Sequence, residues 1–82
     1  MIYKILASRQ FEKDFKTLDS IFQNRIKKKF EEVAKNPERY KHMRPPLNDY
    51  CRIRIDKLRI IFSYNAKEKI LYLEKIVFGH KY

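Results

Sequence analysis

One stretch, residues 50–64, constrains the fold more than any other part of this chain. It reads YCRIRIDKLRIIFSY, in which apolar and polar residues alternate on both sides of Asp56-Lys57. Alternation with a period of two is typical of a half-buried strand, and two such strands separated by two residues form an antiparallel hairpin. We therefore predict strands over 50–55 and 58–64 joined by a two-residue turn.

The register of this hairpin divides its residues between two faces. One face is apolar and belongs to the core; it carries Cys51, Ile53, Ile55, Leu58, Ile60, Phe62 and Tyr64. The opposite face carries Arg52, Arg54, Arg59, Ile61 and Ser63. In this register Arg54 lies directly across from Arg59, with Arg52 two residues along the same face.

These three arginines are the strongest indication of function in the chain. Like charges directly opposed on a sheet destabilise it by up to about 1 kcal/mol, so a cluster of guanidinium groups suggests a bound anion. The planar arginine fork binds a phosphate through two parallel hydrogen bonds, and a fixed positive cluster stabilises charge that develops on phosphate during transfer. The alternative is a solvated face on which Glu74 of the next strand neutralises Arg59.

Helical patterns precede the hairpin. Ile2–Ala7 alternates as a first strand, and Ser8 is a candidate N-cap for a helix with the apolar stripe Phe11, Phe15 and Leu18. Asp19 or Ser20 caps a second helix, which ends at Asn36-Pro37. Its apolar stripe comprises Phe22, Ile26, Phe30 and Val33.

A third strand over 70–78 completes the predicted fold, after a proline-bearing loop over 37–49 and the hairpin. In this strand Leu71, Leu73 and Val77 are predicted to face the core, with Lys75 as the exception to the pattern. The order is therefore β-α-α-β-β-β. We predict one α+β domain over residues 1–82, with the helical hairpin packed on one face of a small, mainly antiparallel sheet.

Charge limits the classes of partner. Twenty Lys and Arg against ten Asp and Glu leave a net charge of +10, which indicates a polyanion, with nucleic acid ahead of a membrane surface or an acidic protein. A basic surface without any ligand is the alternative. One cysteine and two histidines predict neither a disulfide nor a metal site, and we expect no cofactor. No apolar run approaches the roughly 20 residues of a membrane span, and the N-terminus lacks a signal-peptide pattern, so we expect a cytoplasmic protein.

The last residues, Gly79-His80-Lys81-Tyr82, are predicted to follow the strand beside the arginine face. The ordinary pKa of histidine, about 6.5, suits proton transfer near neutrality, which makes His80 a candidate acid or base. Tyr82 offers a surface on which a nucleobase can stack, as does Tyr50.

The order and spacing of these segments resemble the RelE/ParE superfamily of toxin–antitoxin toxins. The likeness covers nearly the whole chain and is carried by YCRIRIDKLRIIFSY and by ILYLEKIVFGHKY, with its closing Gly-His. The RelE-like branch implies a ribosome-dependent mRNA endonuclease that inhibits translation without a metal. In that chemistry the ribose 2′-hydroxyl attacks the adjacent phosphate and leaves a 2′,3′-cyclic phosphate and a 5′-hydroxyl.

The resemblance implies roles for individual residues. Arg52 and Arg54 fall where the family carries two basic residues on the first hairpin strand, and Arg59 falls on the phosphate-stabilising arginine. Lys81 falls on a C-terminal basic residue that assists the leaving group. Tyr82 resembles the terminal tyrosine of the YoeB-type members.

The general base stays open at this point. Some relatives carry lysines at positions 52 and 54, where one can act as the base, but arginine does not give up its proton. The candidates are His80, His42, Asp49 and Glu74. In the remaining alternative, the rate comes mainly from positioning and charge stabilisation.

Partners follow from charge and resemblance together. We expect a RelB-like antitoxin whose acidic or amphipathic segment covers the arginines in a hetero-oligomer, with the ribosome and mRNA as targets and no membrane. The alternatives are a gyrase-inhibiting protein of the ParE branch and a catalytically inactive RNA-binding relative. Retention of the three arginines and a terminal His and Tyr favours the nuclease.

Overall fold

The alternating residues form the hairpin that their pattern predicts. In the computed structural model, which describes residues 2–78, β2 (Cys51–Ile55) pairs antiparallel with β3 (Leu58–Asn65). The predicted register is confirmed, because Cys51 pairs with Phe62 and Arg54 pairs with Arg59. Asp56 in the turn has a φ of 57°, a left-handed conformation that aspartate tolerates better than most residues.

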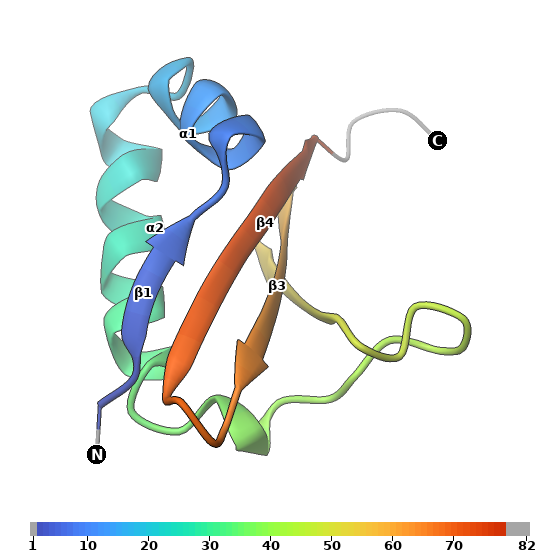
Figure 1. Cartoon of the computed structure of the whole chain (residues 1–82). Helices are drawn as coiled ribbons and strands as arrows, with labels where there is room; N and C mark the ends of the chain where they lie inside the picture. Colours follow the sequence, from blue (N-terminus) through green and yellow to red (C-terminus); the bar gives the residue numbers. More distant parts are fainter. Residues whose placement is uncertain (1, 79–82) are drawn as a thin grey trace.

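Two further strands complete one mixed sheet. Strand β4 (Ile70–Phe78) is antiparallel to β3, and β1 (Lys4–Ala7) is parallel to β4, which gives the order β1-β4-β3-β2. The predicted α+β class, the β-α-α-β-β-β order and the mainly antiparallel sheet are therefore confirmed. The helices pack on one face of this sheet (Figure 1).

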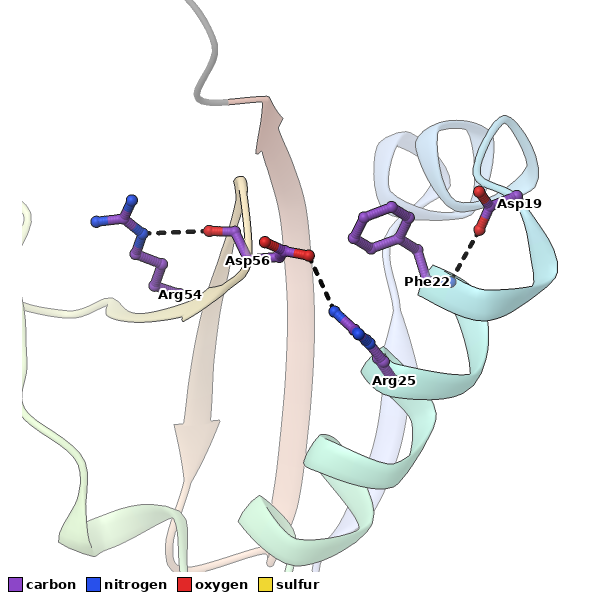
Figure 2. A network of polar contacts seen from close by, with 5 residues as sticks. All are labelled: Asp19, Phe22, Arg25, Arg54 and Asp56. Carbon is purple, nitrogen blue, oxygen red and sulfur yellow. Dashed lines mark hydrogen bonds and ion pairs between the residues drawn. The ribbon is translucent and has the colours of Figure 1, made fainter.

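Side-chain caps start both helices. The Ser8 hydroxyl accepts a hydrogen bond of 3.0 Å from the Phe11 amide at the start of α1 (Arg9–Lys16). Of the two candidates for the second cap, Asp19 fills the position: its carboxylate accepts a bond of 3.0 Å from the Phe22 amide at the start of α2 (Ser20–Val33), as Figure 2 shows. A short 3-10 helix, η1 (Pro37–Arg39), follows α2.

The core lies between the helices and the inner face of the sheet. The Phe30 ring of α2 meets the Phe62 ring of β3 edge-on, with 5.4 Å between ring centroids. Cys51 is fully buried in this core, as its position on the apolar face predicts. The apolar face of the hairpin thus packs in the core, and its opposite face contacts the segment before β2 or solvent.

A β-bulge in β4 changes which residues of this strand face the core. Ile61 pairs with Lys75 but the next residue, Phe62, pairs with Leu73, so Glu74 is the extra residue of the longer strand. The bulge shifts the alternation by one residue. Ile76 is therefore buried, and the prediction that Val77 faces the core was wrong.

The segment between η1 and β2 lies on the other side of the sheet from the helices (Figure 1). A bridge between His42 and Cys51 ties its backbone to β2, and a hydrogen bond of 2.8 Å from the Met43 amide to the Tyr50 carbonyl closes the segment on itself. We refer to residues 40–50 as the outer loop. None of the helices in the described part of the chain has the length and apolar character that a membrane span requires.

Candidate nucleic-acid interface

A groove of about 680 Å³ lies between the outer loop and the outer face of the sheet. Its sheet side includes Ile61 of β3 and Val77 of β4, which the strand pairing places on the outer face. Its loop side is formed by Met43, Leu47 and Tyr50. This outer groove therefore combines an apolar surface with an aromatic ring.

Cations dominate the charge of the outer groove. Arg52 of β2, Arg59 of β3 and Lys75 of β4 line it, together with the carboxylate of Glu74. Arg52 and Lys75 are exposed, and Arg59 is partly buried. Three cationic side chains from three neighbouring strands can hold a phosphate while the apolar loop side contacts a base.

Arg54 shares the outer face but not the outer groove. Its Nε donates a hydrogen bond of 3.2 Å to the Asp56 carbonyl at the hairpin turn (Figure 2). The Asp56 carboxylate accepts from Arg25 Nη1 of α2 at 2.9 Å. Because both members of that ion pair are about half exposed, it adds little to stability.

The structure thus brings two of the three predicted hairpin arginines into one groove. Arg52 and Arg59 line it together, and Arg54 lies at the turn, where it borders a second hollow with basic residues of α2. His80, Lys81 and Tyr82 lie outside the described residues. Their part in the site stays a prediction.

Two serines hold Glu74 at the bulge. The Ser63 hydroxyl donates to the Glu74 Oε2 at 2.7 Å, and the Ser8 hydroxyl donates to the Glu74 backbone carbonyl at 2.5 Å. The alternative placed Glu74 beside Arg59, but β4 begins with Ile70 paired to Asn65, and this register puts Glu74 near Ile61 and not across from Arg59. The bulge instead makes Val77 the pairing partner of Arg59, while the Glu74 carboxylate is bonded to Ser63.

His42 fastens the outer loop and does not line the groove. Its Nδ1 lies 2.8 Å from the Asn48 carbonyl and its Nε2 lies 3.1 Å from the Tyr64 hydroxyl. Since a carbonyl only accepts, Nδ1 carries a proton and donates to Asn48. Both nitrogens of this candidate base are thereby engaged in holding the loop.

Within residues 2–78, no three side chains of His, Cys, Asp or Glu gather in a group that could hold a metal ion. The polar and charged residues that line the outer groove are Gln10, Tyr50, Arg52, Arg59, Glu74 and Lys75.

The profile of the ParE toxins of type II toxin–antitoxin systems matches residues 5–77. The chain belongs to this family of toxins, within the RelE/ParE superfamily. A curated relative, RelE4 of Methanocaldococcus jannaschii, is 44% identical over 45 residues. That alignment covers 54% of this chain and 48% of the relative, so the chain spans about half the length of the relative it matches.

Solved structures of RelE toxins share the fold. The toxin–antitoxin complex RelBE2 of Mycobacterium tuberculosis matches with a TM-score of 0.85 at 14% identity, over 95% of this chain and 99% of the other. The isolated Escherichia coli RelE toxin matches with a TM-score of 0.82 at 19% identity, over 98% and 87%. The RelE–RelB complex of Pyrococcus horikoshii matches with a TM-score of 0.77 at 20% identity, over the full length of both chains. At these identities the likeness concerns the fold.

Sequence reasoning missed part of the toxin's groove. No periodic pattern assigns Met43, Leu47 and Gln10 to it, because the first two lie in an irregular loop and Gln10 lies in the first turn of α1. Lys75 did carry a signal. A lysine at a position predicted to be buried, followed by an apolar residue, indicates that the strand changes phase between Leu73 and Ile76.

Proposed function

We propose that this toxin is a ribosome-dependent mRNA endonuclease that cleaves without a metal and so inhibits translation. The observation that carries the proposal is that Arg52 and Arg59 line the same groove as Tyr50 and the apolar residues of the outer loop. A protein that only binds a polyanion needs a positive surface. A protein that cleaves RNA also needs to fix one phosphate and one base relative to each other, which this groove can do.

In the proposed cleavage, each polar residue of the groove has a separate role. Arg52 and Arg59 hold the scissile phosphate, and the base beside it stacks on Tyr50. The ribose 2′-oxygen attacks the phosphorus, and the bond from phosphorus to the 5′-oxygen breaks, which leaves a 2′,3′-cyclic phosphate and a 5′-hydroxyl. Both arginines stabilise the negative charge that builds up on the phosphate oxygens in the transition state. Lys81 is proposed to give the leaving oxygen its proton, with His80 and Tyr82 completing the site.

A RelB-like antitoxin is the proposed protein partner, together with the ribosome and mRNA as targets in the cytoplasm. Two of the solved relatives are complexes of a RelE toxin with its antitoxin, from M. tuberculosis and P. horikoshii. An excess of cations on the chain and along the outer groove suits an antitoxin segment that is acidic.

The second candidate is a non-catalytic toxin that inhibits DNA gyrase. The matching family profile, which describes ParE toxins, favours it. A non-catalytic toxin has no chemical need for a groove that gathers phosphate-binding cations beside a stacking surface, so we place the nuclease first.

Primer extension on a translated message tests the proposal. We expect ribosome-dependent cuts with the wild type, and a loss of about 100-fold or more in cleavage with Arg59→Ala, as for removal of one transition-state donor. Lys27→Ala, on α2 over the opposite face of the sheet, is the matched control and should cut like the wild type. Gyrase–DNA adducts without any cuts in mRNA would instead establish the second candidate.

A further inference from the structure

The bulge in β4 places two consecutive residues on one face. In a regular strand neighbouring side chains point to opposite faces, but Glu74 and Lys75 both line the outer groove, beside Ile61 of β3. A bulge of this kind redirects a side chain at the cost of local strand pairing, and bulges recur beside active sites. Here the effect is to add one carboxylate to a groove that is otherwise cationic.

Hydrogen bonds to two serines hold the backbone and the side chain of Glu74. The Ser8 hydroxyl, which also caps α1, binds the Glu74 backbone carbonyl, and the Ser63 hydroxyl binds one carboxylate oxygen at 2.7 Å. Glu74 is partly buried. Ser63 binds Oε2, and the second carboxylate oxygen, Oε1, is the atom that can accept a proton from a bound molecule.

The other groups in the groove are poor proton acceptors. The charged groups that line it with Glu74 are Arg52 from β2, Arg59 from β3 and Lys75 from β4, and none of these cations has a lone pair to offer. The outer loop adds the phenol of Tyr50, and α1 adds the neutral amide of Gln10. Among the described residues of the groove, the carboxylate is the one ready base.

We infer that Glu74 is the proton acceptor for the ribose 2′-hydroxyl, an inference that rests on the proposed cleavage. The 2′-hydroxyl proton passes to the Glu74 carboxylate as the bond from the 2′-oxygen to phosphorus forms. The bond from phosphorus to the 5′-oxygen breaks, and that oxygen takes a proton from water, either directly or through Lys81, which water then protonates again. Glu74 then returns its proton to water. Arg52 and Arg59 hold the phosphate, and Lys75 adds positive charge next to the Glu74 carboxylate.

The test is single-turnover cleavage of a ribosome-bound message by the full chain carrying Glu74→Gln. We expect the cleavage rate to fall by about 100-fold or more, which is the usual contribution of a general base. Binding of a message with a 2′-deoxyribose at the cleavage site should be unchanged or tighter, because the variant removes a negative charge from a cationic groove. The rise in wild-type rate with increasing pH on the acid side should be absent in the variant.

Two further variants distinguish a proton acceptor at position 74 from a structural role of Glu74. Glu74→Asp keeps a carboxylate and should cleave faster than Glu74→Gln, and Glu12→Gln, exposed on α1, should match the wild type. Cleavage by Glu74→Gln near the wild-type rate would overturn the inference and leave the nuclease intact. A parallel loss of binding and cleavage with an unchanged pH profile would make Glu74 a positioning residue and also overturn it. Absence of cleavage by the wild type would overturn the proposed function and this inference together.

Discussion

At the scale of single residues, Tyr3 links the first strand to the segment after α2. Its hydroxyl donates a hydrogen bond of 2.6 Å to the Glu38 carboxylate, and its ring meets that of Tyr64 edge-on. The hydrogen bond to Glu38, followed by burial, raises the pKa of Tyr3 to about 12 from an ordinary value of 10.0. The phenol is therefore held in its protonated form by the fold.

This pKa predicts how stability depends on alkaline pH. The unfolded chain loses the phenolic proton at lower pH than the folded chain, so the contribution is complete below about pH 10 and is lost as the pH rises toward about 12. Tyr3→Phe should be less stable than the wild type at neutral pH and should lose less stability between neutral and alkaline solution. Urea unfolding at about pH 8 and about pH 11 measures both. An equal alkaline loss in the two proteins would contradict the assignment.

Cys51 provides a second prediction at this scale. Burial raises the pKa of its thiol, and the side chain is fully enclosed in the core. Since the thiolate is the reactive form, a disulfide reagent should modify the native protein only as fast as the fold opens, and the urea-unfolded chain much faster. Rapid labelling of the native protein would show that strand β2 is not packed as described.

At the scale of elements, Ser8 couples α1 to the bulge in β4. Its hydroxyl accepts from the Phe11 amide and donates to the Glu74 carbonyl. Ser8→Ala should lower the free energy of unfolding by about 1–2 kcal/mol, the usual cost of a lost N-cap. Ser20→Ala is the matched control, because Asp19 caps α2, and should be close to neutral. Equal effects of the two changes in a urea titration would argue against the coupling.

The hairpin is the element that the sequence predicts best. A two-residue turn and strict alternation admit one register, so the sequence alone predicts the pairing of Arg54 with Arg59 and the burial of Cys51. The bulge was missed, although Lys75 in the apolar row signals a change of phase, because its position depends on how β3 pairs with β4. The direction of Arg54 also escaped prediction, since its hydrogen bond to Asp56 is a property of one rotamer and not of the pattern.

The contribution of the outer loop to the groove could not be predicted from the sequence. Its residues lack periodicity, so nothing in the chain predicts that Met43 and Leu47 approach Arg52 and Arg59. The bonds of His42 to Asn48 and Tyr64 hold this loop through contacts that are distant in sequence. The groove residues of β2 and β3 were therefore predictable from strand alternation, whereas Lys75 and Val77 after the bulge and the residues of the outer loop were not.

At the scale of the whole molecule, the net charge of +10 predicts salt-sensitive binding to RNA. Each phosphate contact to single-stranded RNA contributes about 0.7 to the slope of log affinity against log salt concentration. Arg52→Ala should lower that slope by about this amount, and Lys27→Ala should leave it unchanged. Fluorescence anisotropy with a 2′-deoxy-substituted RNA measures the slope. Equal slopes for all three proteins would place RNA elsewhere on the surface.

The central claim is that the outer face of the sheet, and not the helical face, is where RNA is cut. Single-turnover cleavage of a ribosome-bound message, with the new ends identified by mass spectrometry, tests it most directly. We expect 2′,3′-cyclic phosphate ends from the wild type, rates lower by about 100- to 1,000-fold for Arg52→Ala and Arg59→Ala, and a wild-type rate for Lys27→Ala. Full cleavage by both arginine variants, or a comparable loss with Lys27→Ala, would contradict the account.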